Sequence, residues 1–269
     1  KTVQGQFEYP GASDGVGTEA RFRGPTGVAL DQDGNIYVAD KGNHKIRKIS
    51  PSGVVSTLAG TGLVGSDDGP GSIASFNNPT GIAVDPDGVV YVADQGNDRV
   101  RKITRDGMVS TITALTRVPD NYHLDGPTSL AVDAERDIYV AHWHANLIRK
   151  LTPNGIVTNI ALGPIGSSDG PEASGHFNGP QGLAVDKAGN LLVLDAGNSL
   201  VRRISPDGVV TTVAGQPKVI GAADGYGPDA TIAGSGGLAI DNLGNLLIAD
   251  SGNNEIRLAE PTDQGLLIN

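Results

Sequence analysis

The sequence has no cysteine, a single tryptophan, few aromatic residues and no long apolar run. Without cysteine, disulfides and thiol chemistry are excluded. The aromatic content is 4% and the formal charge is −10, whereas a single-stranded nucleic-acid site needs a basic groove and stacking aromatics. No run approaches the roughly 20 apolar residues that cross a bilayer. We therefore expect no nucleic-acid partner and no insertion into a membrane.

Targeting and modification signals are also scarce. No Asn-x-Ser/Thr acceptor occurs, which favours a bacterial source or a compartment without glycosylation. No signal peptide is visible, although a chain that begins at Lys1 is compatible with its removal. We expect a secreted or periplasmic location rather than a cytoplasmic one.

One pattern recurs five times along the chain. Its first copy occupies residues 24–60 and begins GPTGVALDQDGNIYVADKGN. Aligned on the aspartate that closes the first apolar run, the copies lie 54, 48, 53 and 55 residues apart, at Asp31, Asp85, Asp133, Asp186 and Asp241. A period of this size indicates a repeat architecture with one supersecondary unit per copy.

Each copy predicts four short antiparallel strands, which in the first copy cover residues 27–31, 35–40, 44–49 and 54–59. The first strand is small and apolar in every copy (GVALD, GIAVD, SLAVD, GLAVD, GLAID), and the third is half charged, so polarity rises across each sheet. Five such sheets indicate an all-β fold, a β-propeller of five four-stranded blades, one per repeat of about 53 residues. We expect a single domain over residues 1–269.

The strings PTGVALDQDGNIYVADKGNHKIRKI, PTGIAVDPDGVVYVADQGNDRVRKI and PQGLAVDKAGNLLVLDAGNSLVRRI resemble NHL repeats, as does the connector string DGxxxxAxF. The resemblance covers all five copies and implies a propeller, although NHL propellers commonly have six blades. The N-terminal string KTVQG matches the fourth-strand string STLAG, so we expect Lys1–Gly5 to complete the fifth blade and close the ring. The alternative is that the tail DQGLLIN completes that blade, and that the chain is a segment of a six-bladed propeller.

Charged residues recur at fixed positions in the copies. The second strand ends in Asp before a Gly-Asn pair in four copies, as at Asp40, and the third strand carries an Arg in all five, as at Arg47. We expect the Asp to cap a turn in which the Gly is left-handed, and the Asp and Arg to pair within each blade. A functional charged ring is the alternative.

The connectors between the copies are about 15 to 20 residues long, beyond ordinary connections, and long ordered loops often carry function. Four of them contain Asp-Gly, which we expect to form Asx turns, because Ca²⁺ needs six or more converging oxygens and is therefore disfavoured. Each blade carries its connector at the same end as the turn between its second and third strands. We expect the binding face at that end.

The third copy departs from the pattern at that end. Where other copies read Asp-x-Gly, it reads His142-Trp143-His144, and the connector before it contains Asp120, Tyr122 and His123. Three imidazoles, His123, His142 and His144, could bind Zn or Cu, with Asp120 or Asp125 completing the set. An aromatic binding surface of Trp143, Tyr122 and Asp120 and a neutral variant of the turn are the other interpretations. A left-handed backbone at His144 would favour a functional role.

Two functions from different classes follow. The first is a non-catalytic scaffold that binds a protein, a small molecule or a carbohydrate at the connector face, as NHL propellers often do. The second is a metal-dependent enzyme, because some relatives with NHL-like propellers are lyases and related propellers include lactonases. Their ligands come from several blades, whereas the histidines here cluster in one, so the resemblance transfers no catalytic residue. No nucleophile elbow, Walker loop or HExxH motif is present, which favours the scaffold.

Overall fold

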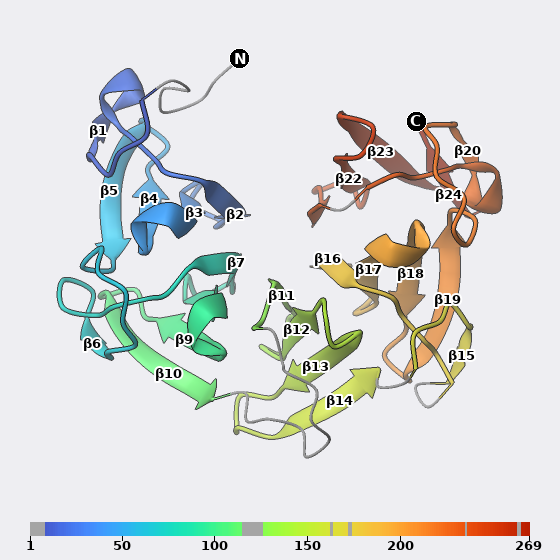
Figure 1. Ribbon diagram of the computed structural model, residues 1–269, viewed down its shortest axis with the longest axis horizontal. Helices are drawn as coiled ribbons and strands as arrows, with labels where there is room; N and C mark the ends of the chain where they lie inside the picture. Colours follow the sequence, from blue (N-terminus) through green and yellow to red (C-terminus); the bar gives the residue numbers. More distant parts are fainter. Residues whose placement is uncertain (1–8, 115–125, 162–163, 172–173, 235, 263–264) are drawn as a thin grey trace. The chain divides into compact units, whose positions relative to one another are not determined.

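The computed structural model is a five-bladed all-β propeller, with one antiparallel sheet for each repeat (Figure 1). It describes residues 9–114, 126–161, 164–171, 174–234, 236–262 and 265–269. Within these ranges the only helices are single 3₁₀ turns, none of them long or apolar enough for a membrane span. The chain divides into two compact units, Lys1–Leu130 and Ala131–Asn269.

The first unit contains the first two sheets. The first follows the order β1-β5-β4-β3-β2, built from β1 (Gly15–Val16), β2 (Pro25–Leu30), β3 (Ile36–Asp40), β4 (Lys45–Ile49) and β5 (Val54–Ala59). The second repeats this as β6-β10-β9-β8-β7, built from β6 (Gly69–Pro70), β7 (Pro79–Val84), β8 (Val90–Asp94), β9 (Arg99–Ile103) and β10 (Met108–Ala114). The 3₁₀ turns are η1 (Gly17–Glu19), η2 (Lys41–Asn43) and η3 (Gln95–Asn97).

The second unit contains the fourth and fifth sheets and most of the third. The third sheet consists of β11 (Ser129–Val132), β12 (Ile138–His142), β13 (Leu147–Leu151) and β14 (Val157–Ala161). The fourth consists of β15 (Gly170–Pro171), β16 (Pro180–Val185), β17 (Leu191–Asp195), β18 (Leu200–Ile204) and β19 (Val209–Ala214), with the turn η4 (Ala196–Asn198). The fifth consists of β20 (Gly225–Tyr226), β21 (Leu238–Ile240), β22 (Leu246–Asp250), β23 (Glu255–Thr262) and β24 (Gly265–Ile268), with the turn η5 (Gly227–Asp229).

Four sheets have a fifth strand that the four-stranded prediction lacks. It is the two-residue strand formed by the Gly of the Asp-Gly connector and the residue after it, and it pairs with the fourth main strand of the following blade. In β1, Gly15 has φ 146°, a backbone conformation that residues with a side chain rarely adopt. The connector therefore extends the sheet beyond its fourth main strand.

The fifth sheet corrects the expected role of the N-terminus. Strand β24, from the C-terminal tail, pairs with β23 on one side and with β20 on the other. Strand β24 therefore occupies the position in the fifth sheet that was expected for Lys1–Gly5. It forms a hairpin with β23, whose short loop costs little closure entropy. Residues 1–8 themselves lie outside the described residues. The tail interpretation of the fifth blade is the one the structure supports.

The apolar cores lie between neighbouring sheets of the same unit. In the first unit, Ile46 of the first sheet and Val92 of the second belong to one buried cluster. In the second unit, Ile148 of the third sheet and Val193 of the fourth belong to another, and a further cluster joins the fourth and fifth sheets. The second strands are apolar at nearly every position because they are buried; every residue of β8, β12 and β17 is buried. This packing holds the turns at both ends of each sheet in place.

Candidate functional site

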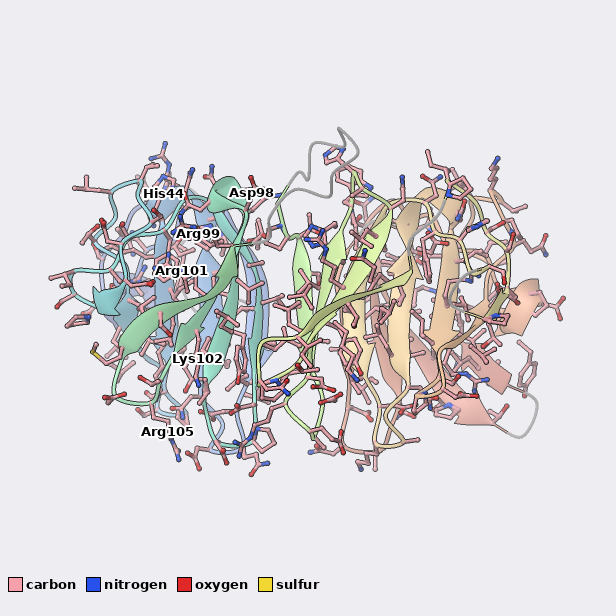
Figure 2. The ribbon with its side chains drawn as sticks, turned by 90° about the horizontal axis from the view of Figure 1, so that it is seen from below. His44, Asp98, Arg99, Arg101, Lys102 and Arg105 are labelled. Atoms are coloured by element: carbon pink, nitrogen blue, oxygen red, sulfur yellow. The ribbon has the colours of Figure 1, made fainter. Side chains whose placement is uncertain are left out.

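Each sheet has two ends that carry different loops. At the connector end lies the turn between the second and third main strands, and at the hairpin end lie the two other turns. Figure 2 shows this in the first unit, where His44 and Asp98 lie at one edge and Arg105 at the opposite edge. The site predicted from the sequence lies at the connector end.

A buried ion-pair network occupies the regular blades. In the first sheet, Arg47 is fully buried, with Nη1 2.9 Å from Asp40 Oδ2 and Nη2 2.6 Å from Asp14 Oδ1. The ring of Phe22 lies 5.0 Å from the guanidinium carbon. The same ion pairs recur in three other blades, at Arg101 with Asp94 and Asp68, Arg202 with Asp195 and Asp169, and Arg257 with Asp250 and Asp224. The predicted pairing within blades is confirmed in these four.

Two details of the predicted turns are wrong. The connector aspartates form no local turn with their carboxylates; Asp14 instead accepts hydrogen bonds from Arg47 and from the amide of Thr57 in β5. The left-handed residue of the second turn is His44, at φ 54°, rather than the preceding glycine. Gly42 is required for a different reason, since a Cβ there would lie 2.7 Å from the carbonyl oxygen of Arg23. Glycine permits the close approach of two chain segments.

The network shifts carboxyl pKa values in both directions. Burial raises the pKa of Asp94, although hydrogen bonds from Asn77 and Arg101 oppose the shift. At Asp68, burial acts in the same direction but is outweighed by hydrogen bonds from Thr111 and Arg101, so the pKa is lowered. The residues of this network are already engaged with one another, and their role is structural.

The third blade differs at the connector end, as predicted from its sequence. His142 takes the place of the paired aspartate and is fully buried, whereas Trp143 is 42% exposed and His144 is also exposed. The Trp143 and His144 rings lie 4.7 Å apart. Arg149 Nε donates to Asn159 Oδ1 at 3.2 Å, and burial lowers the pKa of this arginine. The two histidines of the turn therefore lie in different environments.

The left-handed residue of this turn is Asn146, at φ 51°, and the suggestion of strain at His144 is wrong. The Asn146 Oδ1 atom accepts the amide of Gly179 at 2.7 Å, as His44 Nδ1 accepts the amide of Asn78 in the first unit. Trp143 covers the same glycine, because a Cβ on Gly179 would lie 2.2 Å from the indole Nε1. Trp143 is thus fixed against the entry to β16.

The proposed ligand set is only partly visible. His123, Tyr122, Asp120 and Asp125 lie outside the described residues. Across the described part of the chain, no group of three or more His, Asp or Glu side chains is arranged to hold a metal ion. A Zn or Cu site that includes His123 stays a prediction.

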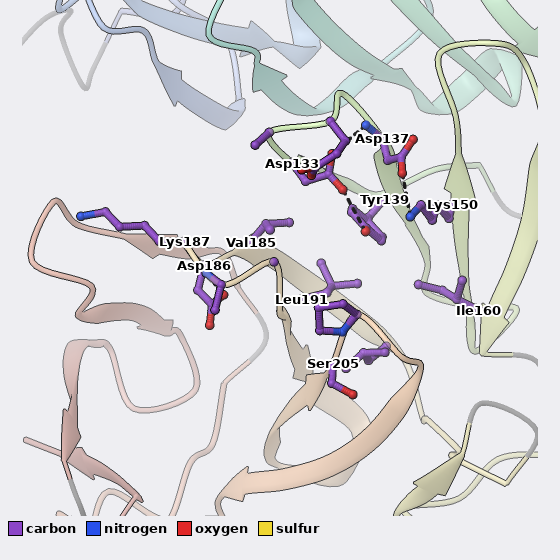
Figure 3. A pocket seen from close by; sticks show the side chains of 16 residues that line it. Asp133, Asp137, Tyr139, Lys150, Ile160, Val185, Asp186, Lys187, Leu191 and Ser205 are labelled. Atoms are coloured by element: carbon purple, nitrogen blue, oxygen red, sulfur yellow. Dashed lines mark hydrogen bonds and ion pairs between the residues drawn. The ribbon is translucent and has the colours of Figure 1, made fainter.

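A cavity of about 480 Å³ lies at the hairpin end, between the third and fourth sheets (Figure 3). Sequence reasoning did not identify it. Its walls come from the turns and strands around residues 133–139, Lys150, Ile160, residues 185–191 and residues 204–206. The volume falls in the range typical of small-molecule sites.

Polar groups of the third sheet line one side of this cavity. Tyr139 Oη donates to Asp133 Oδ2 at 3.0 Å, and Lys150 Nζ lies 2.6 Å from Asp137 Oδ2 (Figure 3). The Lys150 ammonium also lies 5.5 Å from the centre of the Tyr139 ring. Burial and the charge of Asp133 raise the pKa of Tyr139 to about 12. The pKa of Lys150 is raised despite burial, because Asp137 and Tyr139 stabilise its charged form.

The equivalent groove between the first and second sheets is nearly closed. It is lined by the corresponding residues, yet its volume is about 60 Å³. Arg105 lies in it, with Nη2 3.1 Å from Asp33 Oδ2, whereas the fourth copy has Pro206 at this position. Proline also occupies it in the first and third copies, as Pro51 and Pro153. Arg105 is therefore the residue of the smaller groove that departs from the repeat at this position.

A second departure lies in the first turn of the third blade. Where other copies read DQDGN, DPDGV, DKAGN and DNLGN, this one reads Asp133-Ala-Glu-Arg-Asp137. Arg136 replaces the turn glycine and has φ 67°, close to the 80° of Gly34. Asp137 replaces Asn35, whose Nδ2 donates to Asp31. Comparing all turns of the repeats, rather than the second turn alone, would have revealed this signal in the sequence.

The NHL repeat family matches three of the five copies, at residues 22–49, 76–103 and 177–204. NHL repeat-containing protein 2 of Bos taurus is 28% identical over 285 aligned residues, covering 96% of this chain and 34% of that protein. The chloroplastic protein SUPPRESSOR OF QUENCHING 1 of Arabidopsis thaliana is 44% identical over 94 residues, 35% of this chain and 9% of that protein. The chain thus spans about a third or less of these two relatives.

Solved structures with the same fold have varied functions. An auxiliary nutrient binding protein from Bacteroides ovatus superposes with a TM-score of 0.68 at 16% identity, covering 92% of this chain and 60% of that one. A virginiamycin B lyase from Staphylococcus aureus gives 0.63 at 16% identity, covering 94% and 73%. A gluconolactonase from Xanthomonas campestris gives 0.62 at 16% identity, covering 92% and 76%. At these identities the likeness shows the fold alone.

Proposed function

Because the chain belongs to the NHL-repeat β-propellers, a fold that serves both binding proteins and enzymes, we propose that it acts as a non-catalytic binding module. Its small-molecule site is the cavity between the third and fourth sheets. The observation that carries this proposal is the contrast in volume between the two equivalent grooves, about 480 Å³ against about 60 Å³.

The walls of the cavity suit a small ligand. Ile160, Leu191 and Ile204 provide an apolar surface, and Tyr139 and Lys150 are held in fixed positions by hydrogen bonds and ion pairs with neighbouring carboxylates. Ligand pockets combine apolar surface with polar groups in fixed positions, and both are present here, with polar and charged side chains prominent in the lining. The auxiliary nutrient binding protein from Bacteroides ovatus is an example of a binding protein with this fold, which supports the proposal.

Ligand-detected NMR with a panel of monosaccharides, lactones, amino acids and alkyl amines tests this function. We expect at least one class to bind the native protein, and the Pro206→Arg variant, which places in this cavity the side chain that closes the other groove, to lose that binding. The matched control is Asp33→Asn in the closed groove, which leaves binding unchanged. Equal binding by Pro206→Arg would remove the cavity as the site.

A second surface is favoured by the exposed Trp143 and its contact with His144. We propose that this connector-end surface binds a carbohydrate, because sugars pack on exposed aromatic rings that are held rigidly. The chain has one tryptophan, so its fluorescence reports on this surface alone. Titration with oligosaccharides is expected to shift the emission, and His144→Ala to weaken the response. An unchanged spectrum would exclude carbohydrate at Trp143.

The enzyme alternative depends on a metal. Elemental analysis of the purified protein, with the His142→Ala/His144→Ala variant beside it, tests this directly. A stoichiometric transition metal that is lost in the variant would support a metal-dependent enzyme over a binding module.

A further inference from the structure

In the first unit, the Arg105 side chain lies in the groove between the hairpin ends of the first and second sheets. Arg105 extends from the turn between β9 and β10, and its Nε atom would lie 3.1 Å from a Cβ on Gly88. Its guanidinium reaches the preceding sheet and forms the ion pair with Asp33. The chain itself therefore places an alkylguanidinium between two neighbouring hairpin ends.

The open cavity of the second unit keeps the acidic partner but has no arginine at the equivalent position. Glu135 stands two residues after Asp133, as Asp33 stands two residues after Asp31, and Pro206 stands where Arg105 does. The guanidinium of Arg105 thus lies in the groove between the first and second sheets, and the cavity between the third and fourth sheets has no side chain of this kind at the equivalent position.

The charge of the cavity also differs from that of the closed groove. Four carboxylates and two ammonium groups line the cavity, a formal charge of −2 at neutral pH, contributed by Asp133, Glu135, Asp137, Asp186, Lys150 and Lys187. The closed groove has two of each sign, contributed by Asp31, Asp33, Lys48 and Arg105, and is neutral. A cavity with excess negative charge attracts cations and repels anions.

Each of the two lysines of the cavity already has a partner. Lys150 Nζ is paired with Asp137, and Lys187 Nζ donates to the carbonyl of Asn242 at 2.7 Å, pointing away from the cavity in Figure 3. Glu135 lines the cavity and is exposed. An exposed carboxylate in the lining can pair with a cation that enters from solvent.

Part of the cavity lining is apolar and suits an alkyl chain. Val185, Leu191, Ile204 and Pro206 come from the fourth sheet, and Ile160 comes from the third. In the closed groove the methylene groups of Arg105 lie in the corresponding position, against Gly88. Burial of apolar area contributes about 25 cal/mol per Å², so each methylene group of a ligand adds to binding.

We propose that this cavity binds a small organic cation, a guanidinium carried on an alkyl chain, with the cation paired to Glu135 and the chain against Leu191 and Ile204. This inference rests on the proposed function, since it assigns a ligand class to the same cavity. The cation occupies the place that the side chain of Arg105 fills in the other groove.

The test compares n-butylguanidinium with n-butylurea, its neutral counterpart of similar shape, by calorimetry on the native protein. We expect one equivalent of n-butylguanidinium to bind and n-butylurea to bind at least about tenfold more weakly. We expect Glu135→Gln to weaken the cation about fivefold and leave n-butylurea unchanged, since one partly exposed charge pair is removed. Pro206→Arg abolishes binding of both compounds.

A gain-of-function variant sharpens the test. Arg105→Ala opens the first groove, which retains Asp33, so the stoichiometry of n-butylguanidinium is expected to rise from one to two. Thermal melts confirm that each variant is folded. Glu135→Gln changes an exposed side chain, so it keeps the test decisive should Pro206→Arg fail to fold.

The outcomes separate this inference from the proposed function. Equal binding of n-butylurea and n-butylguanidinium would overturn the cation class but keep the cavity as a site. Binding of another panel compound that Pro206→Arg abolishes, with no binding of n-butylguanidinium, would do the same. Absence of any binding to the native protein would overturn both.

Discussion

The two equivalent grooves of this repeat protein have the same wall positions but opposite contents. Between the first and second sheets, Arg105 spans the groove and pairs with Asp33. Between the third and fourth sheets, proline and an acidic turn leave a cavity of about 480 Å³. The two grooves therefore differ at two equivalent positions. Arg105 and Asn35 line the nearly closed groove, and Pro206 and Asp137 line the cavity that is the candidate site.

The connector end of the blades shows the opposite relation. There the ion-pair network is nearly identical in four copies, and the third copy replaces its aspartate by His142. A repeated network fixes the frame, and departures from it mark the places where selection for stability has been relaxed or opposed. The third blade departs from the repeat at both ends, at residues 142–144 and at residues 133–137. Substitutions in the repeated network and at these departures therefore test whether the two kinds of position differ in their effect on stability.

The largest effect is expected from removing the buried aspartate of a regular blade. In Asp195→Ala, Arg202 remains fully buried and loses its ion pair at 3.1 Å. Removing one partner of a buried ion pair costs about 3–5 kcal/mol of unfolding free energy, and Asp169, whose side chain is half exposed, compensates the charge of Arg202 only in part. Urea denaturation measures the loss, with the exposed Asp207→Ala as the matched control in the same blade. A loss below about 1 kcal/mol would contradict the structural role of the network.

The second largest effect concerns Gly179 beneath Trp143. Gly179→Ala places a Cβ 2.2 Å from the indole Nε1 and gives a left-handed residue a side chain, at φ 61°. We expect a loss of about 2–4 kcal/mol, against about 1 kcal/mol for Gly24→Ala, which has φ 56° but open space around the added atom. The Gly179→Ala/Trp143→Ala double variant should recover most of the difference. Equal losses in the two single variants would show that Trp143 does not hold this contact in solution.

Sequence reasoning predicted the strands well because their pattern is local. The strand predicted at 54–59 matches β5, and that predicted at 35–40 matches β3 to within one residue at its start. The two-residue strands such as β1 were missed, since a Gly flanked by loop residues has no strand pattern of its own. Their pairing depends on Asp14 reaching Thr57, 43 residues away.

The candidate site was harder to predict for the same reason. The departures at His142 and Trp143 are visible within one copy, and the structure places both at the predicted turn. The contrast between Arg105 and Pro206 gains meaning only when one knows that this turn faces the first turn of the preceding sheet. No local pattern encodes a contact across 72 residues such as that of Arg105 with Asp33.

Alkaline pH should affect the two grooves alike. Burial raises the pKa of both Tyr37 and Tyr139 from 10.0 to about 12. Between pH 10 and 12 the unfolded chain loses these phenolic protons and the folded chain keeps them, so the unfolding free energy falls as pH rises through this range. Tyr139→Phe should make this fall less steep, by about 1 kcal/mol per pH unit at pH 11. Absorbance titration of the phenolates at 295 nm in single Tyr→Phe variants checks the pKa values, and a Tyr139 pKa near 10 would contradict the buried pair with Asp133.

The smallest effect is expected in the acidic turn beside the cavity, where Arg136 has the left-handed conformation that glycine adopts in the other copies. Arg136→Gly relieves this strain but adds freedom to the unfolded chain, so we expect a net gain of only about 0.5 kcal/mol. Gly34→Arg, the reverse exchange in the first sheet, should cost about 1 kcal/mol. Urea denaturation measures both. A clear loss of unfolding free energy in Arg136→Gly would contradict this expectation. It would mean that the contacts of the Arg136 side chain stabilise the turn by more than the left-handed backbone costs.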